Sequence, residues 1–216
     1  MPSEPFDFVT PKGRHVRARL DRPAGPVRAY ALFAHCFTCG KDSLAATRIA
    51  RALAADGVGT LRFDFAGMGE AGMDHAPEGF SADVAELVAA GEAMAAQGCA
   101  PQLLIGHSLG GAAAIAAAGA LPSVRAVATI AAPFDVGHVL KLLGPQAEGL
   151  MHGETHAALI AGRSVRVDAR FAADLKMQDQ EARLKSLGRP LLILHSPVDQ
   201  VVGIEESSRI YLAAKH

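Results

Sequence analysis

Ser108 lies in the stretch 106–110 (GHSLG), which has the Gly-x-Ser-x-Gly spacing of a nucleophile elbow. In such an elbow the serine occupies a sharp, strained turn between a strand and a helix, and its hydroxyl projects from the carboxyl edge of a parallel sheet. The context fits, because 101–105 reads as a buried strand and 112–120 as a helix of small residues. The pattern therefore predicts a serine nucleophile. The alternative is an ordinary glycine-rich turn in which the serine only caps the helix.

A serine nucleophile needs two partners. Its hydroxyl reacts poorly until a base removes the proton, and that base must be oriented by a third group. In a fold with this elbow the chain order is serine, then an acid, then histidine. Asp199 is the acid that this order predicts, because it lies in a turn just after the apolar stretch 190–194. The alternative is an aspartate that only shapes the turn.

The negative charge that develops on the attacked oxygen must be met by two backbone N–H groups. Leu109, the residue after the nucleophile, is expected to supply one of them. The second N–H group comes from the loop after an earlier strand, and Phe37 is placed for that role because it follows the apolar stretch 27–34. Each such donor is worth about 3 kcal/mol of transition-state stabilisation.

Apolar stretches and helical patterns alternate along the chain. Strands are expected at 15–20, 27–34, 58–63, 101–105, 124–130 and 189–194. Helices are expected from Asp42 or Ser43 to about 56, from Ser81 or Asp83 onward, over 112–120 and over 204–215. This order predicts an α/β fold, with a mostly parallel sheet flanked by helices. The alternating stretch 15–20 is expected to be an exposed edge strand.

The alternation breaks between 134 and 187, a segment too long for a plain crossover between two strands. Within it we expect a helix at 136–143, a strand at 165–171 and a helix at 178–187. We interpret 134–187 as a cap over the site, inserted in a single domain that spans 1–216. A decoration without substrate contact is the alternative. Apolar cap residues that could form an acyl or aromatic pocket, or simply bury the cap, are Phe134, Leu140, Leu143, Leu150 and Met151.

Four stretches in the right order resemble the α/β-hydrolase superfamily: 35–42 (HCFTCGKD), 62–69 (RFDFAGMG), 106–111 (GHSLGG) and 195–199 (HSPVD). Within it, the chain is similar to esterases and acyl hydrolases, including feruloyl esterases, and most of all to the hydrolase half of bacterial proteins with an OsmC-like domain. The resemblance runs from about residue 14 to the last residue. It implies an α/β-hydrolase fold and cleavage of a carboxylic ester or related acyl bond through an acyl-enzyme. It further implies a small acyl substrate, no metal or organic cofactor, and an OsmC-like domain at the C-terminal side of the full polypeptide.

The sequence departs from the superfamily at two points. Many relatives have glycine where this chain has Cys36, so the oxyanion loop is expected to be shaped differently. The superfamily also places its catalytic histidine after a further strand beyond the acid, whereas His216 is the only histidine after Asp199 and ends an expected helix. We therefore expect the base to lie beyond residue 216, in a last strand and helix that are missing here.

Two other functions stay open. Cys36 and Cys39 form a C-x-x-C pair after a strand and before a helix, a setting typical of thiol-disulfide oxidoreductases. A zinc site built from His35, Cys36 and Cys39 is disfavoured, because adjacent residues point apart and no second ligand pair has zinc spacing. The second alternative is a non-catalytic interaction module that keeps the hydrolase scaffold.

Composition narrows the class of protein. Of the 216 residues, 50% are hydrophobic and 20% are charged, which is typical of a globular domain. The net charge of -1 gives no reason to expect nucleic acid or an anionic membrane as partner. The first residues do not form a signal peptide, and no apolar run approaches the ~20 residues of a membrane span. Three cysteines suit a reducing cytoplasm better than a disulfide framework.

Overall fold

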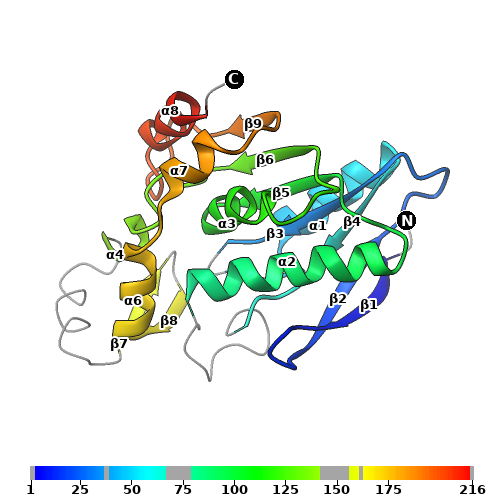
Figure 1. Ribbon diagram of the computed structural model, residues 1–216, viewed down its shortest axis with the longest axis horizontal. Helices are drawn as coiled ribbons and strands as arrows, with labels where there is room; N and C mark the ends of the chain where they lie inside the picture. Colours follow the sequence, from blue (N-terminus) through cyan, green and yellow to red (C-terminus); the bar gives the residue numbers. More distant parts are fainter. Residues whose placement is uncertain (1–2, 37–38, 67–78, 142–155, 161–162, 215–216) are drawn as a thin grey trace.

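The main sheet has seven strands in the order β1-β2-β4-β3-β5-β6-β9 (Figure 1). The computed structural model describes residues 3–36, 39–66, 79–141, 156–160 and 163–214. The strands of the main sheet are β1 (Ser3–Val9), β2 (His15–Asp21), β3 (Ala29–Ala34), β4 (Val58–Arg62), β5 (Leu103–His107), β6 (Ala126–Ile130) and β9 (Leu191–Leu194). Strands β3, β4, β5, β6 and β9 run parallel to one another, whereas β2 pairs with both β1 and β4 in the antiparallel sense. The predicted α/β fold with a mostly parallel sheet is confirmed.

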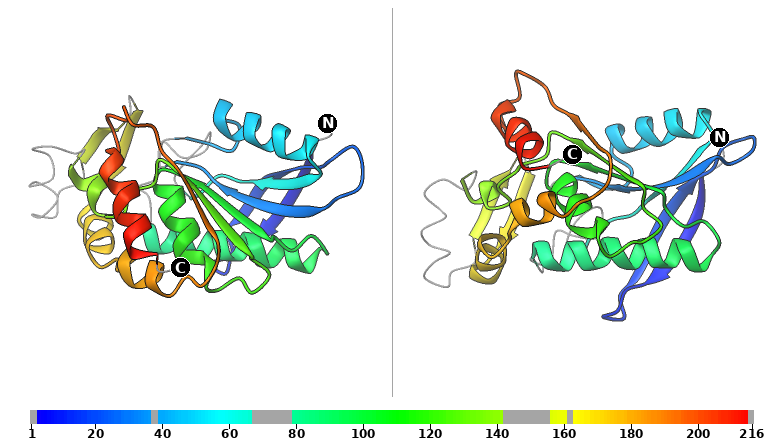
Figure 2. Two further views of the ribbon diagram at one scale, coloured as in Figure 1. Left: turned by 90° about the horizontal axis from the view of Figure 1, so that it is seen from above. Right: turned by 45° about the horizontal axis from the view of Figure 1, so that its top comes forward.

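Helices cover both faces of this sheet. They are α1 (Leu44–Ala55), α2 (Phe80–Ala96), α3 (Leu109–Ala118), α4 (His138–Lys141), α6 (Ala169–Lys176), α7 (Gln180–Lys185) and α8 (Ile204–Ala213). Helix α1 lies on one face, and α2 and α3 lie on the other (Figure 2). Small residues make up most of α3 and nearly all of them are buried, so this helix packs closely on β5. None of the described helices combines the length and the apolarity that crossing a bilayer requires.

The amino-terminal hairpin differs from the sequence expectation. Strand β2 is not an exposed edge, because it lies between β1 and β4 in the sheet. Strand β1 was not predicted. Its Phe6 and Phe8 are buried, and the ring of Phe8 meets the edge of Phe63 at 5.7 Å between centroids. Alternation of Phe6 and Phe8 with polar residues is a strand signal, and Pro5 is compatible with it because an edge strand tolerates proline.

The segment between β6 and β9 forms structure outside the main sheet. It contains the hairpin of β7 (His156–Ile160) and β8 (Arg163–Val167), followed by α6 and α7. The expected strand at 165–171 is wrong beyond 167, because Asp168 accepts a hydrogen bond from Phe171 N at 2.9 Å and so caps α6. Helix α4 is short, and residues 142–143 of the expected helix lie outside the described residues. Whether this segment contacts substrate stays a prediction.

Hydrogen bonds attach that segment to helices α2 and α3 of the domain. Ser81 N at the start of α2 donates to the Asp174 carboxylate of α6 at 2.8 Å. The buried Gln180 side chain at the start of α7 donates to Ala112 O of α3 at 3.1 Å. Helix α7 therefore packs on α3 as a crossover helix between β6 and β9 does.

Strand β9 ends the sheet on the side opposite β1. Leu191 and Ile193 pack on the core, while Leu192 and Leu194 are 56% and 47% exposed. Among the described residues, β6 is the only strand that pairs with β9.

Candidate active site

Ser108 has the backbone geometry of a nucleophile elbow. Strand β5 ends at His107, helix α3 begins at Leu109, and Ser108 between them has φ 55° and ψ -126°. A positive φ is strained for a residue with a side chain, so the surrounding structure must enforce it. One enforcing contact is the hydrogen bond from Ser108 N to Ile130 O of β6, at 2.8 Å. The serine therefore sits at the carboxyl edge of the sheet, beside the end of β6.

The glycines around Ser108 leave room for this turn. A Cβ on Gly106 would overlap the backbone of Gly110, and a Cβ on Gly110 would overlap the carbonyl groups of Ala34 and His35 at the end of β3. A Cβ on Gly111 would lie 2.7 Å from the Cβ of Ala132, which is also too close. The spacing of the motif is thus explained by close backbone contacts between α3, β5 and β3.

Gly110→Ala should destabilise the protein by at least about 3 kcal/mol, because two fixed carbonyl groups would have to move. Chemical unfolding followed by circular dichroism measures this. Gly119→Ala is the matched control: it ends the same helix, has φ -66° and has nothing near its missing side chain. The control should unfold within about 1 kcal/mol of the parent. Equal unfolding midpoints for the two variants would contradict the packing described above.

The structure describes one of the two expected oxyanion donors and not the other. The Leu109 N–H belongs to the first residue of α3, so no carbonyl group of that helix accepts its hydrogen bond. Phe37 lies outside the described residues. Its neighbours His35 and Cys36 follow β3, and the close approach of Gly110 to Ala34 and His35 places the end of β3 against the start of α3.

Asp199 follows β9 at the same carboxyl edge as Ser108. Its Oδ1 accepts hydrogen bonds from Val201 N at 2.9 Å and from Val202 N at 3.0 Å. Burial alone would raise the pKa of Asp199, but the hydrogen bonds from Val202 and Val201 outweigh it, so the pKa lies below its ordinary value. Asp199 is therefore a carboxylate at neutral pH, in a turn that fixes one of its oxygens.

His107 lies close enough to Asp199 for the two to interact electrostatically. Burial lowers the pKa of His107, and the Asp199 carboxylate offsets only part of that effect. A neutral imidazole therefore precedes the serine in the chain. The sequence pattern alone did not single out this residue, because it occupies a variable position of the elbow.

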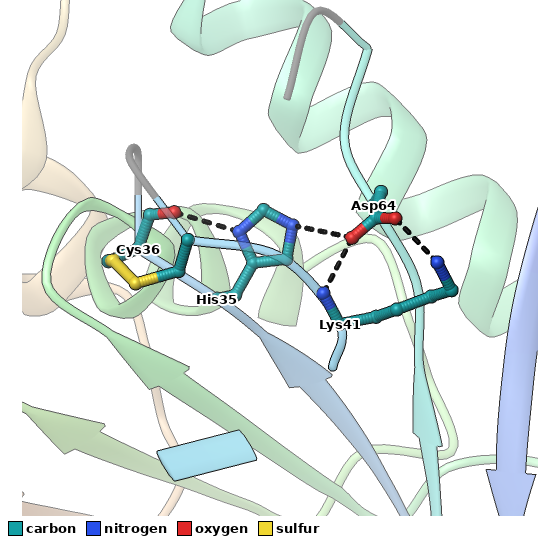
Figure 3. The surroundings of a disulfide bond; sticks show 5 residues. His35, Cys36, Lys41 and Asp64 are labelled. Carbon is teal, nitrogen blue, oxygen red and sulfur yellow. Dashed lines mark hydrogen bonds and ion pairs between the residues drawn. A yellow bond between two sulfur atoms is a disulfide. The ribbon is translucent and has the colours of Figure 1, made fainter. Parts of the chain in front are cut away.

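A network of charged groups holds the loop that follows β3 (Figure 3). Asp64, just after β4, accepts hydrogen bonds from both Lys41 N and Lys41 Nζ, the latter at 2.7 Å. His35 Nδ1 lies 2.8 Å from Cys36 O, whereas His35 Nε2 lies 3.7 Å from Asp64, too far for a hydrogen bond. Burial is the main reason that the pKa of His35 is lowered, so the ring is neutral. Sequence reasoning gave Asp64 and Lys41 no role, although both belong to the stretches that carry the resemblance.

Arg62 supports the same loop from the end of β4. Its guanidinium is buried, donates to the Asp21 carboxylate at 2.7 Å and also donates to Lys41 O. A buried pair of this kind leaves an uncompensated charge if either partner is removed. The backbone at Lys41 is thus held from two sides, by Asp64 and by Arg62.

The described histidines do not supply a base hydrogen-bonded to the nucleophile. None of the hydrogen bonds described for residues 3–36, 39–66, 79–141 and 163–214 joins a histidine ring to Ser108. His195 Nε2 and His138 Nε2 lie 2.7 and 2.8 Å from the carbonyl oxygens of Val202 and Val201. His216 lies outside the described residues.

Cys36 and Cys39 form a disulfide. This corrects the expectation that the cysteines are reduced, although Cys99 is free and is buried. The setting expected for a thiol-disulfide oxidoreductase is also only partly met, because α1 begins at Leu44 rather than directly after Cys39. The histidine that lies near both sulfurs is His107, not the His35 of the zinc site considered above. A ring nitrogen of His107 and the two sulfur atoms lie within 4.8 Å of one another.

The apolar cap residues fall into two groups. Phe134 and Leu140 are partly buried and pack on the main core, and the Phe134 ring also lies 4.2 Å from the Arg209 guanidinium. Leu143, Leu150 and Met151 lie outside the described residues. The two described residues therefore attach the segment to the domain, and a pocket at this place stays a prediction.

Comparison with known proteins agrees with this architecture. A model of the alpha/beta hydrolase family matches residues 31–208. The esterase domain of a Rhodothermus marinus protein is 40% identical, with a TM-score of 0.77 over 100% of this chain and 85% of that one. Est1E from Butyrivibrio proteoclasticus, solved with ferulic acid bound, shares the fold at 20% identity, with a TM-score of 0.82 over 98% of this chain and 86% of that one.

The alpha/beta hydrolase GrgF from Penicillium sp. sh18 also shares the fold, at 16% identity and a TM-score of 0.82, over 100% of this chain and 87% of that one. No curated protein matches the sequence. The family match covers most of the chain, and the 40% identical esterase domain aligns with all of it. The chain therefore belongs to the alpha/beta hydrolase family.

Proposed function

We propose that this protein is a serine hydrolase that cleaves a carboxylic ester, or a related acyl bond, through an acyl-enzyme intermediate. The observation that carries the proposal is the strained backbone of Ser108 at the carboxyl edge of the sheet, directly before the first N–H of α3. Strain of this kind persists where the surrounding structure enforces it, and an elbow uses it to present a hydroxyl to substrate.

In this proposal each group has one role. Ser108 Oγ attacks the acyl carbon and transfers its proton to a histidine. The N–H groups of Leu109 and Phe37 stabilise the negative charge on the acyl oxygen. The Asp199 carboxylate orients the histidine, which follows Asp199 in the chain and lies outside the described residues. The same histidine then protonates the leaving alcohol, and water releases the acid in a second half-reaction.

The substrate class rests on similarity and on apolar residues of the cap. The Rhodothermus marinus relative is named as an esterase domain, and Est1E was solved with ferulic acid. We propose a small apolar or aromatic acyl group, held by the cap segment 134–187. A C-terminal OsmC-like domain in the full polypeptide is also part of this proposal, and it rests only on the resemblance of the sequence.

Labelling with a fluorophosphonate probe tests the mechanism, because the probe reacts with an activated serine. The complete product of the gene should become labelled, and peptide mass spectrometry should place the label on Ser108. Esters of p-nitrophenol with acyl chains of graded length, together with a feruloyl ester, should then reveal the preferred acyl group. Labelling of another residue, or none, would contradict the proposal. Folded protein that neither labels nor hydrolyses any of these esters would favour the non-catalytic module.

A further inference from the structure

We propose that the Cys36–Cys39 disulfide is a reversible thiol-disulfide exchange site, reduced by dithiols, whose oxidised form is the active form of the hydrolase. The second half of this statement rests on the proposed function, whereas the exchange itself does not. The two cysteines are joined in the structure, with their Cα atoms 5.2 Å apart. The roles assigned to Ser108 and Asp199 do not require this bond.

The disulfide is placed where it restricts the oxyanion loop. Phe37 and Thr38 lie between the two cysteines in the chain, so the bond closes a covalent ring that contains their backbone. The chain on either side of this ring is fixed: Cys36 O is hydrogen-bonded by the His35 ring, and Lys41 is held by Asp64 (Figure 3). The expected Phe37 donor therefore lies in a short covalent ring whose two ends are both anchored.

The two sulfurs differ in access, which sets the direction of exchange. Cys36 is 7% exposed, whereas Cys39 is only partly buried. An incoming thiolate therefore attacks Cys39 Sγ, and the electron pair of the broken S–S bond leaves on Cys36 Sγ as a thiolate. The second thiol of the reductant then displaces Cys39, so that the reductant becomes a disulfide and the protein gains two electrons and two protons.

His107 links the disulfide to the nucleophile. Its ring nitrogen and the two sulfur atoms lie within 4.8 Å of one another, and it is the residue directly before Ser108. A neutral imidazole has one N–H, which can donate to the departing Cys36 thiolate. The contact also links the state of the disulfide to the nucleophile. Separation of the two sulfurs changes what the His107 side chain packs against, and His107 is joined by one peptide bond to the strained Ser108.

The position of α1 separates this proposal from a catalytic oxidoreductase. Helix α1 begins at Leu44, so Cys39 does not lie in its first turn, where the positive end of a helix stabilises a thiolate most. The pair therefore lacks one device that makes such cysteines strong catalysts of exchange. It fits a protein that is acted on by dithiols better than one that reduces others.

Reduction should lower kcat, because the loop to which the proposed function assigns one oxyanion donor loses a covalent restraint. Removing one oxyanion donor lowers kcat by about 10²- to 10³-fold, so loosening it should lower kcat by about 10- to 100-fold. KM should change much less, because the segment 134–187 proposed to hold the acyl group does not contain the disulfide. Oxidation of the reduced protein should restore the activity.

The test uses the complete gene product, incubated with dithiothreitol under native conditions and with EDTA present. The chelator ensures that a metal ion held by the two thiols and His107 cannot account for a change. Maleimide-polyethylene glycol then counts the reactive thiols, and a p-nitrophenyl ester gives kcat and KM. We expect two additional reactive thiols on reduction, a lower kcat, and reversal of both by oxidised dithiothreitol.

The variants are Cys36→Ser/Cys39→Ser and, as the matched control, Cys99→Ser at the free buried cysteine. The double variant should have a low kcat that dithiothreitol does not change, while the control should respond as the parent does. Reversal in the parent protein itself shows that the loss of activity is not unfolding. Two outcomes overturn the proposal: a disulfide that resists dithiothreitol in the folded protein, or two new thiols with an unchanged kcat.

A different observation would overturn the proposed function. If neither redox form hydrolyses an ester or reacts with the fluorophosphonate probe, the hydrolase role and its redox control are both overturned. The thiol count still decides whether Cys36 and Cys39 exchange, because that measurement needs no catalytic activity.

Discussion

Ser108→Ala is expected to lower kcat for ester hydrolysis by ~10⁴-fold or more, because no other group can form the acyl-enzyme. The residual rate would come from binding and from the oxyanion donors alone. Alanine keeps the same backbone constraint, so the free energy of unfolding should change little. Measurement of kcat on the complete gene product, with denaturant unfolding alongside, checks both expectations.

Two further variants sharpen this test. Ser43→Ala is the matched control. Like Ser108, Ser43 precedes a helix and makes no side-chain capping bond, but its φ is negative. It should retain parental activity. Ser108→Gly should be inactive and should also raise the free energy of unfolding by about 1 kcal/mol, since glycine adopts a positive φ without strain. Substantial hydrolysis by Ser108→Ala would show that another residue is the nucleophile.

Asp199→Asn should lower kcat by about 10³- to 10⁴-fold, because an amide cannot stabilise the imidazolium that forms during attack. The turn should survive, since the asparagine oxygen can still accept hydrogen bonds from Val201 N and Val202 N. The pKa of Asp199 lies below its ordinary value, so the carboxylate is charged throughout the neutral range, and titration of Asp199 itself should not alter the loss between about pH 6 and 8. The pH profile of kcat/KM for both proteins measures this.

Asp179→Asn is the matched control for this substitution. Asp179 caps α7 by accepting from Ala182 N at 2.8 Å, and asparagine caps helices about as well as aspartate. This variant should keep both its activity and its stability. A loss in Asp199→Asn that is matched by a lower unfolding midpoint would instead indicate that Asp199 only shapes the turn.

The elbow could be predicted from the sequence because its cause is local. Gly106 and Gly110 are required by contacts within one turn, and these contacts depend on spacing alone. Asp199 could be placed in the same way, since it follows a strand that is parallel to β5. The catalytic roles of both residues stay predictions, because none of the described hydrogen bonds joins a histidine ring to Ser108.

Other features depend on chemistry or contacts that the residue pattern does not show, and these were missed. The pairing of Cys36 with Cys39 depends on redox chemistry that an odd cysteine count does not reveal. Asp64 and Lys41 meet only because β3 and β4 are neighbours in the sheet. The end of β8 was misplaced because the alternation of 165–171 continues past Asp168. The available signal was the residue type, since aspartate is favoured at the N-cap of a helix and Asp168 makes that capping bond.

The outer edge of strand β9 affects how molecules of this protein associate with one another. Its outer row of peptide groups has no pairing strand among the described residues, and two leucines project beside it. Such a surface is a template on which a foreign strand can add, which is how intermolecular sheets begin. Residues 1–216 in isolation are thus expected to be sensitive to protein concentration, and a lysine in place of Leu192 would oppose that association by charge repulsion.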